Sequence, residues 1–97
     1  MSVKIMGAVW ELKLGKFQKL VLLAHADHAN DEGICYPSIG RIAWKTELDP
    51  RTVKRINRGL RERGLLEPLR NQKGGRGLST VYRVHPEKGE RLRPYRG

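Results

Sequence analysis

Residues 38–64 read SIGRIAWKTELDPRTVKRINRGLRERG and contain two signals for the start of a helix. Ser38 can accept an amide of the following turn, and apolar residues then repeat at helical spacing as far as Lys45. Asp49-Pro50 supplies an acidic N-cap and a proline at the first helical position, where the missing N–H costs nothing. The segment therefore predicts a short helix over residues 39–45, a tight turn and a longer helix.

The longer helix, residues 50–63, has two faces of different chemistry. Val53, Ile56 and Leu60 form an apolar stripe at helical spacing. Four cations lie within about 60° of the opposite direction, namely Arg51, Lys54, Arg55 and Arg58. Like charges on one face repel one another, and only Glu62 offsets them. The pattern therefore favours a surface that binds an anion over a face that is merely solvated.

Upstream of this segment, the sequence predicts a core helix over residues 16–29, stopped by the turn-forming residues 30–33. Its expected inward side consists of Phe17, Leu20, Leu23, Ala24 and Asp27, widened by Val21 and Leu22. Residues 3–12 permit a short helix without requiring one. Residues 34–36 are expected to be extended, because Pro37 disfavours the α region for the residue before it.

Downstream of Gly64, residues 65–70 and 79–84 predict a β-hairpin, in which Pro68 implies an edge strand. The connecting residues 71–78 are rich in glycine and include two cations, Lys73 and Arg76. Glycine lets a backbone approach a phosphate closely and lets Arg76 reach a groove, whereas the alternative reading is a disordered tip.

The charge of the 97-residue chain is concentrated in one part of it. The formal net charge is +10; residues 1–40 carry four basic and four acidic side chains, and residues 41–97 carry sixteen basic and six acidic ones. Such a field indicates a polyanionic partner, with nucleic acid ahead of an anionic membrane, although solubility alone is the alternative. The length limits the chain to a single modest core.

The order of these elements resembles a winged helix-turn-helix DNA-binding domain. Ile42-Ala43, Leu48, Val53 and Ile56 stand where that motif has its core residues. Over about residues 2–85 the chain also resembles the N-terminal domain of phage and plasmid replication proteins, the replication protein O-like helix-turn-helix group. The matching strings are Ser2-Val3-Lys4, Trp10-Glu11, Leu20-Val21-Leu22-Leu23-Ala24, Ala26-Asp27-His28-Ala29-Asn30-Asp31, Tyr36-Pro37-Ser38-Ile39, Arg51-Thr52-Val53 and Arg63-Gly64-Leu65-Leu66.

The resemblance implies a mainly α fold with a small β-hairpin (α+β), in which a three-helix core and its wing occupy residues 16–85. Residues 1–15 are then an N-terminal extension with a possible short helix, and residues 86–97 are a basic tail, either frayed or the start of a linker. Two positions depart from the group. Glu47 stands where the turn usually has glycine, and Trp44 stands where a polar residue is usual and is expected to be exposed.

The resemblance also implies binding to duplex DNA, with the basic helix in the major groove. Base edges are expected to be read by Arg51, Thr52 and Arg55, since arginine is best suited to guanine. Phosphate contacts are expected from Ser38, Arg41, Lys45, Lys54, Arg58 and Lys73, and a wing contact in the minor groove from Arg76. Because one winged helix buries a small interface, dimerisation or tandem binding on repeated sites is expected.

Residues for other chemistry are sparse. His25 and His28 lie three positions apart, but paired Cys/His clusters are lacking, so neither a metal nor another cofactor is expected. No catalytic set is recognisable, and we expect a protein that is not an enzyme. The aliphatic run Leu20–Ala24 is too short to span a bilayer, a signal peptide is not recognisable, and the single Cys35 suits a reducing compartment; we therefore expect a cytoplasmic protein without a membrane partner.

The sequence leaves the biological role open. The role that the narrower resemblance favours is the origin-binding domain of a phage or plasmid replication initiator, whose usual C-terminal region for recruiting replication machinery is missing from this chain. A phage or plasmid transcriptional regulator or an excision accessory protein could use the same fold. A protein-interaction module anchored by Trp10 and Trp44 is the alternative from another class. RNA binding is disfavoured because no stacking-aromatic motif is present.

Overall fold

The computed structural model describes residues 2–71 and 79–96. In chain order it contains α1 (Val3–Trp10), α2 (Lys16–His28), β1 (Ile34–Cys35), α3 (Ile39–Thr46), α4 (Pro50–Glu62), β2 (Leu66–Arg70), β3 (Val81–Val84) and the 3-10 helix η1 (Pro86–Lys88). The three strands form one antiparallel sheet. The predicted α+β class, mainly helical with a small hairpin, is confirmed. None of the helices in the described residues is long and apolar enough to cross a membrane.

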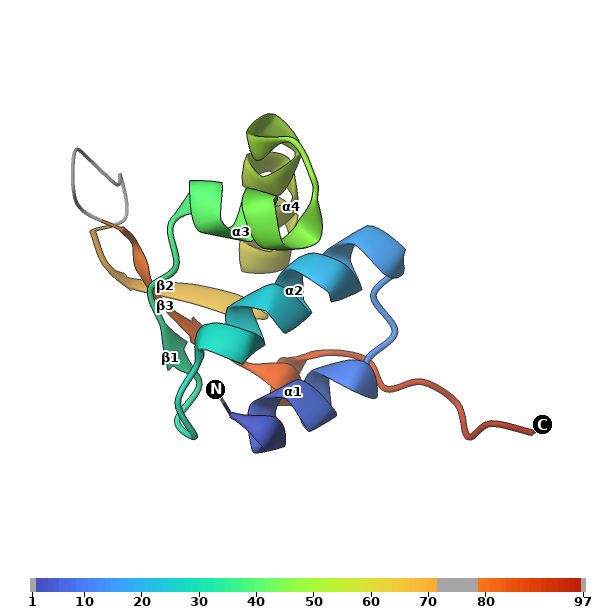
Figure 1. Ribbon diagram of the computed structural model, residues 1–97. Coiled ribbons are helices and arrows are strands. Elements are labelled where there is room, and N and C mark those ends of the chain that lie inside the picture. The colour runs from blue at the N-terminus through green and yellow to red at the C-terminus, as the bar shows by residue number, and fades with distance from the viewer. Residues whose placement is uncertain (1, 72–78, 97) are drawn as a thin grey trace.

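Helix α2 lies at the centre of the molecule and contacts all three other α-helices. Figure 1 shows α1 on one side of α2, with α3 and α4 together on the other. Helix α1, which the sequence permitted without requiring, places Ile5 and Val9 in the common core. Its N-cap is Ser2, whose Oγ accepts the amide of Ile5 at 3.1 Å and donates to Asp31 at 2.9 Å. The N-terminal helix is thus part of the core.

The inward side predicted for α2 is partly wrong. Phe17 and Leu20 are 51% and 40% exposed, whereas every residue from Val21 to Ala26 is buried, and Ala29 with them. The reason is that α2 packs against α1, α3, α4, β1 and β3, so that the consecutive residues Val21 to Ala26 are enclosed on every side of the helix. In the N-terminal half, Phe17 and Leu20 remain at the surface.

The sheet has the order β1-β3-β2, so the predicted extended segment at residues 34–36 begins with a third strand paired to β3. Strand β2 is at the edge, as Pro68 predicted, and its pairing with β3 shifts by one residue between Pro68 and Arg70. Gly33, at the entry to β1, has φ +85°, and a Cβ there would lie 2.7 Å from the Val84 carbonyl oxygen. Glycine is therefore required where the chain turns against β3.

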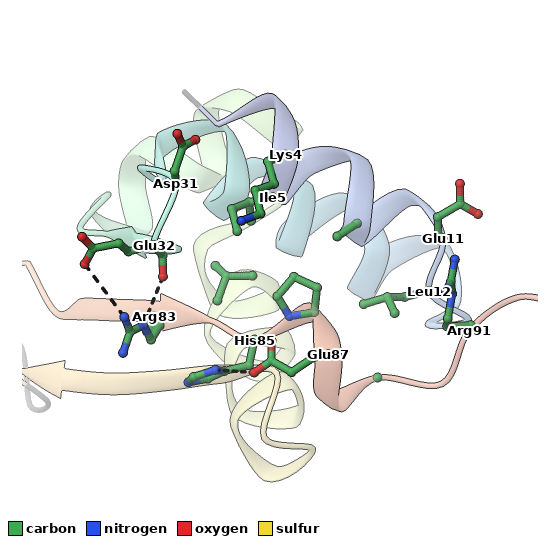
Figure 2. A pocket seen from close by; sticks show the side chains of 14 residues that line it. Lys4, Ile5, Glu11, Leu12, Asp31, Glu32, Arg83, His85, Glu87 and Arg91 are labelled. Carbon is green, nitrogen blue, oxygen red and sulfur yellow. Dashed lines mark hydrogen bonds and ion pairs between the residues drawn. The ribbon is translucent and has the colours of Figure 1, made fainter.

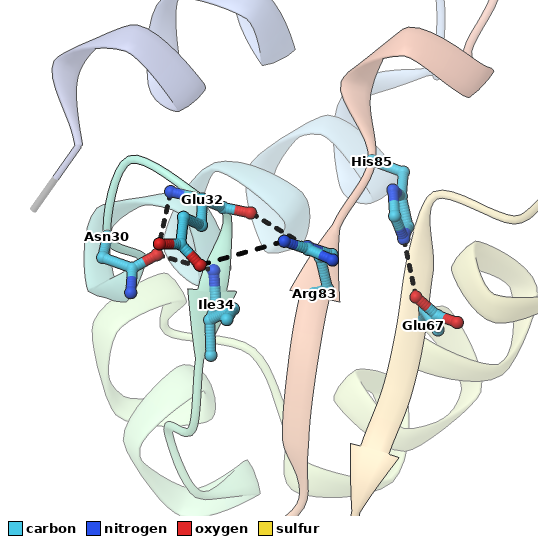
Figure 3. A network of polar contacts seen from close by, with 6 residues as sticks. All are labelled: Asn30, Glu32, Ile34, Glu67, Arg83 and His85. Carbon is cyan, nitrogen blue, oxygen red and sulfur yellow. Dashed lines mark hydrogen bonds and ion pairs between the residues drawn. The ribbon is translucent and has the colours of Figure 1, made fainter.

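The C-terminal segment was predicted to be frayed or a linker, but the structure holds it against the domain as far as residue 92. Lys13 donates its amide to the Glu90 carbonyl at 2.8 Å, and Leu92 donates to the Glu11 carbonyl at 2.7 Å. His85 contacts Glu67 at 2.8 Å, as Figure 3 shows, and also Glu87 at 2.9 Å. The contacts of His85 join β2 to η1, and the backbone bonds pair residues 90–92 with the segment between α1 and α2.

Both predicted helix starts in residues 38–64 are confirmed. Ser38 Oγ accepts the amide of Arg41 at 3.0 Å, and Asp49 Oδ2 accepts the amide of Arg51 at 2.9 Å. Between the two helices, Glu47 has φ 60° and ψ 26°, which is the left-handed region. A side chain there costs roughly 1–2 kcal/mol relative to glycine. The turn of this chain therefore carries backbone strain.

We predict that Glu47→Gly raises the free energy of unfolding by about 0.5–1 kcal/mol, because glycine relieves the left-handed strain at a smaller cost in unfolded-chain entropy. Glu47→Ala, which removes the charge but keeps a Cβ, is the matched control and should not reproduce the gain. Chemical denaturation of the three proteins measures the difference. A loss of stability in the glycine variant would contradict the role assigned to this turn.

Candidate nucleic-acid interface

Helix α4 carries the most polarised surface of the domain. Val53, Ile56 and Leu60 are buried, as predicted. The four cations on the opposite side are all exposed, namely Arg51, Lys54, Arg55 and Arg58. Within residues 2–71 and 79–96, no carboxylate forms an ion pair with any of them. This row, which we call the α4 cationic face, is therefore open to an external anion.

The C-terminal end of α4 is fixed to α2 and to the segment that precedes α2. Arg63 Nη1 donates to Gln18 Oε1 at 2.6 Å, and Nη2 donates to the Lys13 carbonyl at 3.4 Å. Gly59 faces the same glutamine, and a Cβ at this position would lie 3.0 Å from Gln18 Nε2. Gly64 follows with φ +75° and ends the helix. Arg63 is thus a structural cation, distinct from those of the α4 cationic face.

In the middle of α4, Asn57 is 4% exposed and is hydrogen-bonded to His25 of α2, with 2.9 Å between Oδ1 and Nε2. The other ring nitrogen of His25 lies 3.9 Å from Cys35 Sγ, and the imidazole and the Tyr82 ring form a T-shaped pair with 5.4 Å between their centroids. Burial lowers the pKa of His25 to about 4, only partly opposed by the bond to Asn57, so the imidazole is neutral near pH 7.

Sequence reasoning missed this contact and weighed His25 only as a metal ligand. The available signals were the position of His25 within a buried apolar run and that of Asn57 beside the Val53, Ile56 and Leu60 stripe. A polar side chain on an apolar stripe needs a buried partner. In the described residues, no group of three or more His, Cys, Asp or Glu side chains is arranged to hold a metal ion.

The residues expected to read bases lie in the N-terminal half of α4. Arg51 and Arg55 are exposed and belong to the α4 cationic face, while Thr52 is half-buried at its margin. All three lie within two turns of the helix start at Asp49. The structure thus brings the two arginines together on one surface, whereas Thr52 is only partly accessible from that surface.

The residues expected to bind phosphates are more widely spread. Lys54 and Arg58 belong to the α4 cationic face, and Ser38 and Arg41 are exposed at the start of α3. Lys45 points elsewhere: its ammonium group forms an ion pair with Asp27 of α2. The hydrogen bond from Lys45 lowers the pKa of Asp27, so the carboxylate stays ionised and holds this cation against the protein. Lys73 and Arg76 lie outside the described residues.

The helix pair that forms this surface falls within a recognised family. Residues 12–66, more than half of the chain, match the family described as helix-turn-helix domain. The chain belongs to this family. Comparison with curated proteins and with solved structures gave no significant match. Membership indicates DNA binding, and α3, the turn at Glu47 and α4 are the helix-turn-helix motif.

The β2–β3 hairpin completes the winged form of the helix-turn-helix domain. Strand β2 follows α4 directly after the turn at Gly64, and β3 returns along it toward the core. At the outer end of the hairpin, Thr80 donates its hydroxyl to the Asn71 carbonyl at 2.8 Å. This contact closes the hairpin at the base of the 72–78 segment, which is the wing tip in the predicted arrangement.

The helix-turn-helix domain also has an open pocket of about 700 Å³ lined by α1, the residue 31–32 turn, β3 and η1 (Figure 2). Its charged lining residues include both signs, for example Lys4 and Arg91 with Asp31 and Glu87. Arg83 there donates to the Glu32 carbonyl at 3.1 Å. None of the lining residues comes from α3 or α4. The pocket is therefore separate from the α4 cationic face.

We predict that the stability of the helix-turn-helix domain falls by about 3 kcal/mol between pH 6.5 and pH 4, because the unfolded chain binds a proton at His25 over this range and the folded chain does not. The contribution of His25 is fully present above pH 6.5 and is lost as the pH falls toward 4. Urea denaturation at half-unit pH intervals measures it.

His25→Gln is the control, since its amide can donate to Asn57 without titrating. The pKa of His28 is also lowered, chiefly by burial, so the control should show a shallower decline and not a flat one. Equal declines in the two proteins would contradict the assignment to His25.

Proposed function

We propose that this helix-turn-helix domain is a sequence-specific duplex-DNA-binding module without catalytic activity. In the proposed complex α4 lies in the major groove and the end of the hairpin contacts the backbone or minor groove. The observation that carries the proposal is the α4 cationic face: four exposed cations stand opposite a buried apolar stripe, with no acidic partner in the described residues. Phosphates of DNA would supply the missing counter-charge.

The biological role that we propose is origin binding in a phage or plasmid replication initiator. It rests on the sequence strings that resemble the replication protein O-like group, spread over about residues 2–85. Transcriptional regulation or excision by the same fold is the alternative. Because one domain of this size buries a small interface on DNA, we propose binding as a dimer or in tandem on repeats. Selection of bound sites from random duplexes, followed by asking whether they form repeats at an origin or lie in a promoter, decides between these roles.

Trp44 favours a second candidate, a protein-interaction module. It is 72% exposed on the outer side of α3, where a large aromatic side chain has no structural role. Trp10, the other predicted anchor, is 56% exposed but has the Lys19 ammonium 6.0 Å from its ring centre. Both candidates can hold for one protein, because Trp44 is not part of the α4 cationic face. A module without DNA affinity would show no salt-dependent retention on duplex DNA.

We predict duplex binding that weakens steeply with salt. If roughly 5–8 phosphates are neutralised, log affinity should fall with log salt concentration at a slope of about −4 to −7. Fluorescence anisotropy of a labelled duplex, titrated at several salt concentrations, gives the slope. A slope near zero would remove the basis for the DNA-binding proposal.

We predict different signatures for two neighbouring cations of α4. Arg55→Ala should reduce discrimination at one base position by about 1–3 kcal/mol, whereas Lys54→Ala should weaken binding to all duplexes alike. Arg93→Ala removes an exposed cation of the tail and controls for the change in net charge. Affinities for the selected site and its single-base variants provide the comparison. If Arg55→Ala weakens every duplex equally, base reading is assigned to the wrong residue.

A further inference from the structure

The contact between α2 and α4 contains a directional bond that the core does not need for burial. Val53, Ile56 and Leu60 already anchor α4 through apolar packing, which is not directional. Asn57 adds a hydrogen bond of 2.9 Å to His25, between two side chains that are both at most 4% exposed. An amide and an imidazole at these positions both lose hydration, and their bond is tightly restricted in angle as well as in length.

The ring of His25 is in turn oriented from the sheet. Burial raises the pKa of the Cys35 thiol to about 12, so the thiol is protonated and its S–H can point to Nδ1, 3.9 Å away. With Nδ1 as the acceptor, the proton of the neutral ring is on Nε2, which donates to Asn57 Oδ1. The Tyr82 ring, which forms a T-shaped pair with the imidazole at an interplanar angle of 73°, restricts the imidazole on another side. Strands β1 and β3 thereby set the direction of the bond that reaches α4.

A second directional contact lies further along α4. Arg63, at the C-cap, donates to Gln18 of α2 at 2.6 Å, and Gly59 lets the two helices approach beside this glutamine. Helix α2 therefore holds α4 by hydrogen bonds at two positions, residue 57 in the middle and residue 63 at the end. Together with the buried apolar stripe, these two contacts restrict both the position of the helix and its rotation about its own axis.

We propose that His25 and Asn57 are positioning residues for base recognition. Their hydrogen bond fixes the rotation of α4, so that the base-reading side chains keep one orientation, and the loss of the bond lowers discrimination between sequences while leaving general DNA affinity intact. This proposal rests on the proposed function of the α4 cationic face. Neither side chain is available to DNA, because His25 and Asn57 are 1% and 4% exposed and face each other between α2 and α4.

Discrimination between bases is expected to be sensitive to the rotation of α4, because base recognition requires exact placement of the reading side chains. Functional side chains must be held within about 0.5 Å and 10–20° of their productive geometry. Arg51 and Arg55 extend from the side of α4 opposite the buried stripe, so a small rotation of the helix is amplified at their guanidinium groups. Phosphate contacts tolerate the same rotation, since a long flexible side chain can follow a point charge.

The test compares the affinity for a site selected by the wild type with the affinity for a scrambled duplex. In the double variant His25→Leu/Asn57→Leu, apolar groups replace both partners of the hydrogen bond, so that neither the amide nor the imidazole is left unpaired, and only the weak donor Cys35 loses a contact. We expect the ratio of the two affinities to fall about tenfold, close to the discrimination carried by one base pair, while the scrambled duplex is bound as by the wild type. Asn57→Leu alone provides a second measurement if the double variant does not fold.

Two controls separate positioning from stability. His25→Gln keeps a donor toward Asn57 and should retain the wild-type ratio, whereas Ile56→Val loosens the same buried face without removing the bond and should lower stability only. A folded double variant, or a folded Asn57→Leu, with wild-type discrimination overturns the proposal. An equal loss of discrimination in Ile56→Val overturns it as well. If the wild type itself shows no preference among duplexes, the proposed sequence-specific function fails, and the positioning role fails with it.

Discussion

The constraint on which the rest of the domain depends is the burial of one side of α4. Once Val53, Ile56 and Leu60 enter the core, the helical period dictates that the cations between them point outward. The caps then fix where this helix begins and ends. Asp49 sets the first turn, and Gly64 stops the helix before β2. Core packing therefore decides which side of α4 faces outward, and the buried bond between His25 and Asn57 adds a directional contact on the same side of the helix.

The cations of the α4 cationic face lower the stability of the free domain and, at the same positions, favour the binding of an anion. Exposed cations on adjacent turns repel each other, and in the described residues no acidic side chain pairs with them. Lys45 shows the contrast, since Asp27 holds its charge at the boundary between α2 and α3. A phosphate backbone relieves the repulsion that the free protein retains. The unpaired charges thus weaken the isolated domain and favour the complex.

Local signals predicted much of the fold, because they act over one or two helical turns. Ser38, Asp49-Pro50 and Gly64 marked the ends of α3 and α4, and Pro68 marked the edge strand. Contacts between distant segments were not predictable in this way. The exposed positions of Phe17 and Leu20 depend on which neighbours surround α2, and the pairing of β1 with β3 joins residues far apart in sequence.

The same limit applies to the candidate site. Helical periodicity was enough to place Arg51, Lys54, Arg55 and Arg58 on a common exposed face. It could not show that Lys45 would be paired with Asp27, because that requires the relative placement of two helices. For the same reason the bond between His25 and Asn57 was missed. The sequence predicted which face of its own helix each residue occupies. It did not predict which residues each side chain contacts across the core.

The pairing of residues 90–92 with residues 11–13 has a consequence for the order in which the domain forms. It closes a loop of roughly 80 residues, so its entropic cost is recovered only when the elements between have already brought the two ends together. We therefore expect the pairing to form late, and because neither segment belongs to α3 or α4, we expect its opening to leave the packing of these two helices in place. We therefore expect this pairing to melt separately, which would free the C-terminal segment while the helix-turn-helix motif stays folded.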